Sequence, residues 1–252
     1  MRTTQWNDAV SVIDRVTLVL ECFGPDDHRL GVSELARRAN LPKSTVSRLV
    51  SELVEHRYLE RDGTGVRLGL RLFELGELAA QPNALRSLAL AALADLRDAT
   101  GHTVQLVVLD GTDVVCLGTL RGPGSPVPHL RVGARAHAAS TAAGAALLAY
   151  SPADVVARAA GAGLAGTGLA GTGLADAQTL ARVRETGLAY EHDGPDGAVV
   201  GVAGVILSRT RHPLAAIAIT GHSAAFDAAG VGQALRTALL ELGRTHPTTV
   251  WE

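Results

Sequence analysis

The chain has 252 residues, of which 47% are hydrophobic and 3% aromatic, and its formal net charge at pH 7 is −2. This composition excludes a disordered chain, because disorder requires low hydrophobicity and high net charge, and the small total charge gives no global attraction to nucleic acid. With two cysteines and no apolar run near the roughly 20 residues that span a bilayer, we expect no disulfide framework, no membrane segment and a cytoplasmic location.

Three helices are predicted at the start of the chain. Residues 10–23 place apolar side chains at three- and four-residue steps, which is the spacing of an amphipathic helix. Ser33 is typical of an N-cap, so a second, short helix is expected from that serine to Ala39. A tight turn at Asn40-Leu41 leads to a third helix that begins at Pro42, where proline is harmless in the first turn.

The third predicted helix has one apolar face and one face of small polar and basic side chains. At about 100° per residue, Val46, Val50 and Leu53 share the apolar face. The opposite face can approach a DNA backbone closely and hydrogen-bond to base edges, although the same residue types also occur on ordinary solvated helices. We expect contacts with DNA from Lys43, Ser44, Thr45, Ser47 and Arg48.

A β-hairpin is predicted directly after this helix. Residues 58–61 and 66–68 have strand composition and flank a glycine-rich turn at 62–65. Helix, helix, turn, helix and hairpin in this order predict a winged helix-turn-helix DNA-binding domain over residues 1–70. Basic side chains outnumber acidic ones by eight to five between residues 33 and 71. Phosphate contacts are expected from Arg37, Arg38, Arg61 and Arg67, with an unliganded surface role as the alternative for each.

A second domain is predicted behind a linker helix. The chain is helical from 71 to 100 with a break at Gln81-Pro82-Asn83, which gives a linker helix over 71–83 and a second domain over 84–252. Residues 102–109 and 114–120 flank Asp110-Gly111-Thr112-Asp113, a hairpin signal.

The rest of the second domain alternates between strand and helix patterns. Strands are expected at 128–132, 199–207 and 214–220, and helices at 140–150, from Ser151-Pro152, at 176–185 and at 229–244. A Gly-Leu-Ala-Gly-Thr repeat within 163–174 is interpreted as a low-complexity loop. The fold class is therefore α+β, with antiparallel hairpins backed by helices.

Two stretches resemble a known family. Leu41-Pro42-Lys43-Ser44-Thr45-Val46, joined to Tyr58-Leu59-Glu60, closely resembles the DNA-binding domain of IclR-type regulators, and Thr141-Ala142-Ala143-Gly144 resembles the family's Thr-Ala-x-Gly helix start. The resemblance implies a GAF-like effector-binding domain and a homodimer or homotetramer. It also implies repression or activation from a palindromic double-stranded DNA operator under the control of a small metabolite. Asp193 holds one position of the family's usual acidic pair, with His192 at the other.

The effector is expected near the helix start at Ser140-Thr141. A helix N-terminus offers free backbone N–H groups and a partial positive charge, which suit an anion, although either residue could simply cap the helix. Arg131 could equally face outward, Asp193 could sit in a turn, and Cys116 could be plain core. The predicted effector contacts are Cys116, Arg131, Ser140, Thr141, Ala142, Asp193, Val200, Val202, Ile217 and Ile219.

The sequence carries no pattern that organises catalysis or metal binding. It has no Gly-x-Ser-x-Gly elbow, no phosphate-binding glycine loop and no close His/Cys ligand spacing among its nine histidines. We therefore expect no enzyme activity, no metal and no cofactor. The alternatives are an enzyme with a fused DNA-binding domain and a scaffold whose C-terminal domain only dimerises.

Overall fold

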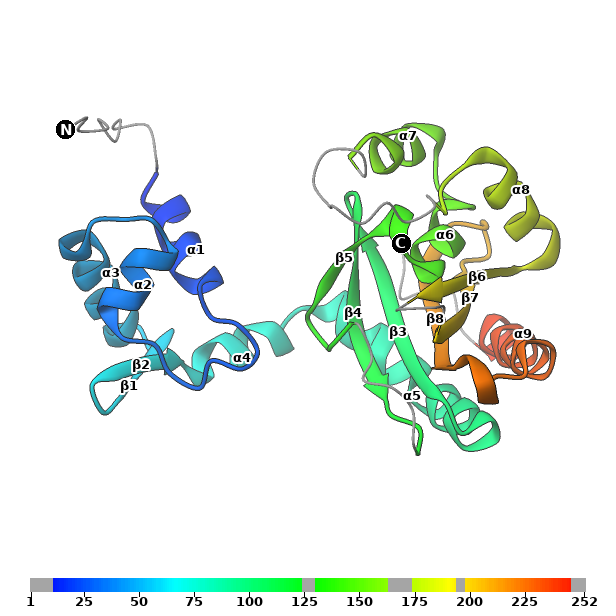
Figure 1. The fold of residues 1–252 in the computed structure, drawn as a ribbon, viewed down its shortest axis with the longest axis horizontal. Coiled ribbons are helices and arrows are strands. Elements are labelled where there is room, and N and C mark those ends of the chain that lie inside the picture. The colour runs from blue at the N-terminus through cyan, green and yellow to red at the C-terminus, as the bar shows by residue number, and fades with distance from the viewer. Residues whose placement is uncertain (1–10, 124–129, 163–173, 194–197, 246–252) are drawn as a thin grey trace. The chain divides into compact units, whose positions relative to one another are not determined.

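The computed structural model describes residues 11–123, 130–162, 174–193 and 198–245 (Figure 1). The chain divides into two compact units, residues 1–80 and 81–252, each of which is described by itself below. None of the described helices is long and apolar enough to cross a membrane.

The N-terminal unit contains three helices, a β-hairpin and a fourth helix. The elements in chain order are α1 (Val12–Glu21), α2 (Val32–Arg38), α3 (Lys43–Glu55), β1 (Leu59–Asp62), β2 (Gly65–Leu68) and α4 (Leu70–Glu77). The two strands pair antiparallel around a turn at Gly63-Thr64, so the predicted winged helix-turn-helix is confirmed. Asn40 has φ +51, a left-handed conformation that asparagine tolerates, and it makes the tight turn between α2 and α3 possible.

One apolar core holds this unit together. Val19 of α1, Leu35 of α2, and Val46 and Leu49 of α3 are buried against Leu59 of the hairpin. The predicted apolar face of the third helix therefore packs as expected. The N-cap of α2 is Gly31 and not Ser33, which is exposed in the first turn of the helix.

The C-terminal unit is built on one six-stranded antiparallel sheet in the order β5-β4-β3-β8-β7-β6. Its strands are β3 (Thr103–Asp110), β4 (Asp113–Leu120), β5 (Arg135–His137), β6 (Leu188–Asp193), β7 (Val199–Leu207) and β8 (Pro213–His222). Its α-helices are α5 (Ala80–Thr100), α6 (Ala142–Leu148), α7 (Ala153–Ala162), α8 (Ala177–Thr186) and α9 (Ala228–Thr245).

Helices cover both faces of this sheet. One face packs on α5 and α9, and the opposite face packs on α6, with α7 and α8 beyond it (Figure 1). The core between the sheet and α6 is rich in alanine, whereas the core on the α5 side is built from leucine, isoleucine and valine. A helix whose seven residues are all buried can lie close to the sheet only because its side chains are mostly methyl groups.

Two further predictions of local structure are wrong, and one strand was missed. The helix break lies at Leu78-Ala79, and Pro82 falls in the first turn of α5, where its missing N–H removes no helical hydrogen bond. Residues 130–132 form no strand, and the strand beside β4 is β5; the rest of the predicted 128–132 strand lies outside the described residues. The strand β6 was not predicted. The low-complexity repeat lies almost wholly outside the described residues.

Candidate functional site

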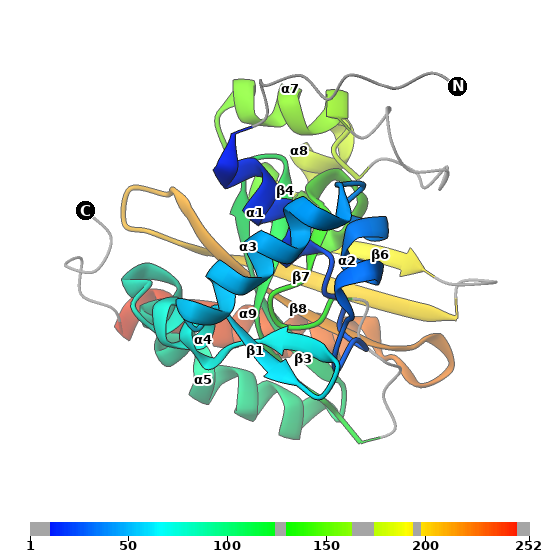
Figure 2. The same ribbon diagram turned by 90° about the vertical axis from the view of Figure 1, so that its left-hand side faces the viewer.

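The exposed face of α3 is the first candidate site. Lys43, Ser44, Ser47 and Arg48 are exposed, Thr45 is half-buried, and the residues between them are buried in the core. Since positions three and four apart share a helix face, these side chains form one polar stripe along α3, which lies across the front of the N-terminal unit in Figure 2. Arg48 makes a loose contact of 3.8 Å with Glu52, so its guanidinium remains available.

The N-terminus of α3 adds backbone donors to this stripe. Pro42 is the N-cap residue, and no side chain caps the first turn. The first backbone N–H groups of a helix have no partner within the helix and attract anions such as phosphate. Lys43 lies in the same turn, so positive charge and open donors coincide there.

The structure ties Arg38 into the fold. Its guanidinium bonds to Asp27, to Glu34 at 2.7 Å and to the carbonyl oxygen of Cys22 at 3.0 Å, which fixes the α1–α2 loop against α2. Arg37 pairs with Glu34 at 2.6 Å from a more exposed position. Hydrogen bonds from these two arginines lower the pKa of Glu34 to about 2. Arg38 is therefore less suited to phosphate contact than the sequence indicated.

The wing presents a different pair of arginines. Arg67 donates to Glu60 at 2.9 Å and 3.1 Å, and Glu60 also accepts from the backbone N–H of Leu70. Arg61 is exposed, and no ion pair to it is found among the described residues. Both wing arginines were predicted to meet phosphates, and of these two, Arg61 is the one for which no ion pair is found among the described residues.

Sequence reasoning missed two basic residues beside the wing. Leu30 forms an isolated antiparallel bridge with Val66 of the wing, and this bridge brings Arg29 beside Gly63. Arg57 has φ +63 at the end of α3 and is exposed at the base of the wing. The position of Arg29 follows from the single bridge between Leu30 and Val66, and the periodicity of the sequence does not reveal such a bridge.

The second candidate site lies on the face of the sheet that packs on α6. Cys116 and Ala142 belong to the core on this face. Val202, Ile217 and Ile219 belong to the core on the α5 side, and Val200 shares their face because side chains alternate along β7. The prediction that these four residues line the same site as Cys116 and Ala142 is therefore wrong. Both faces are buried under helices, so both alternating sets are apolar and the sequence pattern does not distinguish them.

A row of polar and very small residues crosses the α6-facing side. Glu191, Gly201, Thr220 and Thr103 are neighbours in register on β6, β7, β8 and β3. Thr220 is 6% exposed, and within the described chain its hydroxyl has no hydrogen-bond partner. Buried polar groups in folded proteins are nearly always paired, so an unpaired hydroxyl at this place needs an explanation.

Glu191 and Gly201 determine how this row meets α6. The carboxylate of Glu191 accepts from the backbone N–H of Ala142, the first residue of the helix, at 2.5 Å. A Cβ at Gly201 would lie 2.8 Å from Glu191 Oε1, so only glycine leaves room for that side chain. The next row holds Gln105, which donates to the carbonyl oxygen of Leu130 at 2.5 Å. Glu191, Thr220 and Gln105 were not predicted as site residues, because β6 and the strand registers are not visible in the sequence.

The remaining predicted effector residues lie at the start of α6, in a turn and at the end of β6. Thr141 is the N-cap of α6 and accepts from the backbone N–H of Gly144 at 3.0 Å, while exposed Ser140 donates to the carbonyl oxygen of His137. Arg131 is exposed in a turn, and Asp193 ends β6, with its side chain outside the described part of the chain.

The thiol of Cys116 is buried in the core between the sheet and α6. Burial raises the pKa of this thiol, which keeps it protonated and unreactive. Cys116 therefore provides an apolar wall here. No group of three or more His, Cys, Asp or Glu residues could hold a metal ion in the described ranges.

Comparisons with known proteins point to one family across both units. The family described as the IclR helix-turn-helix domain matches residues 12–63, and the family described as the bacterial transcriptional regulator IclR C-terminal domain matches residues 78–245. The glycerol operon regulatory protein of Streptomyces coelicolor is 27% identical over 215 residues, which is 84% of this chain and 85% of that protein. The transcriptional regulator XynR of Escherichia coli is 25% identical over 216 residues, 84% of this chain and 86% of that protein.

A solved structure with a similar fold contains a bound small molecule. An IclR homolog from Microbacterium hydrocarbonoxydans, complexed with 4-hydroxybenzoate, has a TM-score of 0.82 at 27% identity and covers 92% of this chain and 98% of its own. A regulator from Silicibacter, described as a putative member of the same family, has a TM-score of 0.74 at 27% identity, covering 92% and 95% of the two chains.

Proposed function

The chain belongs to the IclR family of transcriptional regulators, and from this premise we propose which residues bind its operator, where its effector sits and how two copies assemble. It is a DNA-binding regulator with an effector-binding C-terminal domain, and its named relatives are regulators and not enzymes. A regulator of chromosomal DNA acts in the cytoplasm.

We propose that α3 enters the major groove of the operator. Ser44, Ser47 and Arg48 read base edges, while Lys43 and the open N-terminus of α3 hold a phosphate. Arg61 holds a phosphate from the wing. The observation that carries this proposal is the exposed polar stripe of α3, which ends at an uncapped helix N-terminus. Arg37, Thr45 and Arg67 make additional contacts with the DNA. Arg38 instead holds the α1–α2 loop against α2.

Selection of DNA sites from a random pool tests this assignment. The wild type should recover a palindromic site, and Arg48→Ala should lose the preference at one base pair in each half-site, because an arginine bidentate to guanine supplies about 1–3 kcal/mol of discrimination. Arg182→Ala removes an exposed arginine from α8 and serves as the matched control. An unchanged selected sequence with Arg48→Ala would contradict the assignment.

We propose that the effector lies on the α6-facing side of the sheet, over Gly201. The observation that carries this is the buried and unpartnered hydroxyl of Thr220, which a ligand can satisfy. The carboxylate of Glu191 offers an acceptor beside it, so the effector presents a hydroxyl or another donor to this row. An anionic group reaches the start of α6 only by displacing Glu191 from the N–H of Ala142.

Calorimetric titration with three related probes tests the effector site. The relative's ligand, 4-hydroxybenzoate, is compared with phenol, which keeps the hydroxyl, and with benzoate, which keeps the carboxylate. Binding of the two hydroxylated probes, weakened about fivefold by Thr220→Val, is the expected result, since one neutral hydrogen bond contributes about 1 kcal/mol. Preferential binding of benzoate, insensitive to Thr220→Val, would place the effector elsewhere.

We propose that two copies of the chain associate through α4. This helix buries none of its residues, and Leu70, Phe73 and Leu78 expose most of their apolar surface along and just after it. A second copy would cover that surface, and the two recognition helices of a two-fold dimer would then match two half-sites of a palindrome. An effector that binds one arrangement of the dimer better would shift the spacing of these helices and thereby change operator affinity.

A further inference from the structure

The tip of the wing carries an arginine from outside the hairpin. Leu30 and Val66 exchange two backbone hydrogen bonds, of 2.8 Å and 2.9 Å, so the chain at Arg29 runs beside β2. A Cβ at Gly65 would lie 3.6 Å from Arg29 Cβ, and a Cβ at Gly63 would lie 3.4 Å from Arg29 Nη1. The side chain of Arg29 therefore passes over Gly65 and places its guanidinium beside Gly63.

The tip itself is narrow. Residues 63–65 are Gly-Thr-Gly, and Gly63 has φ +58, a left-handed conformation that glycine adopts without strain. A Cβ at Gly65 would also lie 3.0 Å from the carbonyl oxygen of Leu30, so a side chain there would crowd the segment that carries Arg29. A turn with so little side-chain bulk can enter the minor groove of B-DNA, which is about 6 Å wide.

The guanidinium of Arg29 is available at this tip. Arg29 is exposed, and among the described residues its side chain forms no hydrogen bond or ion pair. Of the two acidic residues of β1, Glu60 pairs with Arg67, and Asp62 is half-buried without an ion pair to Arg29. No contact within the described part of the chain therefore competes with DNA for this guanidinium.

Arg29 and Arg61 lie on opposite faces of the wing. Arg61 is directly across from Val66 in the hairpin, and Val66 is directly across from Leu30. Residues across from one another point to the same face, and neighbours along a strand point to opposite faces, so Arg29 faces away from Arg61. The narrow tip therefore has one arginine on each side.

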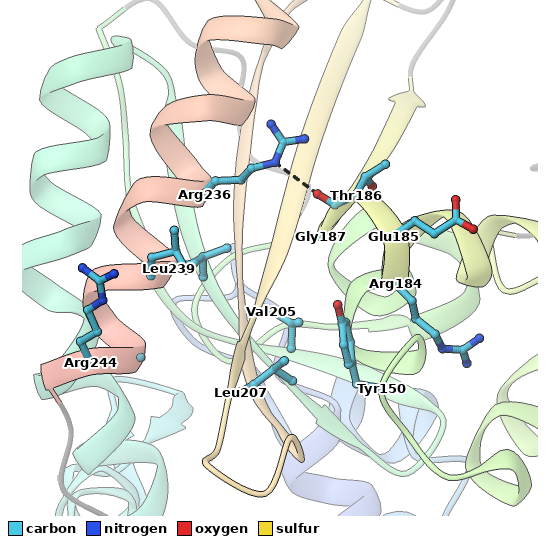
Figure 3. A pocket seen from close by; sticks show the side chains of 12 residues that line it. Tyr150, Arg184, Glu185, Thr186, Gly187, Val205, Leu207, Arg236, Leu239 and Arg244 are labelled. Carbon is cyan, nitrogen blue, oxygen red and sulfur yellow. Dashed lines mark hydrogen bonds between the residues drawn. The ribbon is translucent and has the colours of Figure 1, made fainter.

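Basic side chains on the C-terminal unit have no such common target. Arg184, Arg236 and Arg244 line a hollow of about 540 Å³, but their guanidinium groups lie at separate edges and point away from one another (Figure 3). Arg184 and Arg236 also donate to the backbone carbonyl oxygens of Ala149 and Thr186. The wing, in contrast, combines an unpaired guanidinium with a shape that fits a groove of DNA.

We propose that the tip of the wing enters the minor groove beside each half-site and that Arg29 lies in that groove, where it selects A·T pairs. This inference rests on the proposed reading of the adjacent major groove by α3, which lies on the same side of the N-terminal unit as the hairpin (Figure 2). A·T-rich minor grooves are narrow and have an enhanced negative potential that attracts arginine. A G·C pair places the amine of guanine in the minor groove, and this donor disfavours a guanidinium there. Arg29 therefore selects base pairs that α3 does not contact.

Selection from a random pool, followed by fluorescence anisotropy with designed duplexes, tests the role of Arg29. The wild type should recover A·T pairs about five base pairs, half a helical turn, from those that α3 reads. Replacing these A·T pairs with G·C should weaken wild-type binding about tenfold. Inosine·C pairs should restore it, since inosine lacks the minor-groove amine of guanine but keeps its major-groove pattern. Arg29→Ala should bind the three duplexes alike.

Two further variants distinguish reading of the groove from binding of a phosphate. Arg29→Lys keeps the charge, but an ammonium is more strongly hydrated than a guanidinium, so this variant should lose most of the preference for A·T. Arg61→Ala removes the proposed phosphate contact from the other face of the wing and should weaken binding to all three duplexes by the same factor. Every variant should keep the base preference that depends on Arg48, which shows that α3 still docks.

The possible failures are distinguishable. A preference for A·T that is unchanged in Arg29→Ala or in Arg29→Lys would overturn the proposal, as would inosine·C duplexes that bind as weakly as G·C duplexes. A wild type that recovers the pairs dependent on Arg48 without the neighbouring A·T pairs would contradict the role of Arg29 alone. A wild type that recovers no palindromic site would contradict the reading of DNA by α3 and, with it, this inference.

Discussion

Removing the hydroxyl of Thr220 should stabilise the ligand-free protein. Thr220 is buried and its Oγ1 has no partner within the described chain, so the folded state bears the desolvation of that hydroxyl without a compensating hydrogen bond. An unsatisfied buried polar group costs about 1–3 kcal/mol, and Thr220→Val replaces it with a methyl group of the same shape. We expect a gain of about 1–2 kcal/mol in the free energy of unfolding. For a unit of this size, that gain raises Tm by about 2–8 °C.

The cross-strand neighbour Thr103 provides the matched control. Thr103 is also fully buried, but its Oγ1 accepts from the backbone N–H of Gly122 at 3.4 Å. Thr103→Val leaves that amide without a partner and should therefore lower the stability by about 1–3 kcal/mol. Thermal unfolding by circular dichroism, at one protein concentration and without ligand, measures both variants. A Tm for Thr220→Val that falls as it does for Thr103→Val would refute the reasoning that the hydroxyl awaits a ligand.

Three further predictions concern other parts of the chain. Burial lowers the pKa of His102, which stacks on Phe226 with ring centroids 4.9 Å apart, so its contribution to stability is present above pH 6.5 and is lost as the pH falls. His102→Phe should make the free energy of unfolding, measured by denaturant titration, less dependent on pH between 6.5 and 5. Arg38→Ala should speed amide exchange in α2 several-fold more than Arg37→Ala, because only Arg38 also ties down the α1–α2 loop; equal rates would contradict this. The proposed association through α4 predicts that Phe73→Glu sediments as a monomer, whereas Leu240→Glu, at the same 64% exposure, leaves the association intact.

The N-terminal unit could be predicted from sequence because its signals are local. The apolar stripe of α3, the turn at Asn40 and the glycine turn of the wing each lie within a few residues. The pairing of Arg38 with Asp27 could not be predicted, because it joins a loop to a helix across 11 positions.

The proposed effector site depends on strand register, which the sequence does not display. Glu191 lies on a strand whose alternation of polar and apolar residues is short and interrupted, so β6 gave no clear signal. Val202 and Ile217 follow the same pattern as the residues of the opposite face, because α5 and α6 bury the two faces of the sheet alike. The sequence indicated the start of α6 as the region of an effector site, and the row of residues that we propose there is visible only from the pairing of four strands.

We propose that this chain reads a DNA sequence through α3. The most direct test is fluorescence anisotropy with fragments from beside its own gene and with scrambled fragments, over a salt series, for the wild type and Arg48→Ala. We expect one fragment to be bound at least about 10³-fold more tightly than its scrambled counterpart. Arg48→Ala should reduce that ratio about tenfold or more while the salt dependence of binding changes little. Equal affinity for all fragments, falling together with salt and the same in both proteins, would contradict sequence-specific recognition by α3.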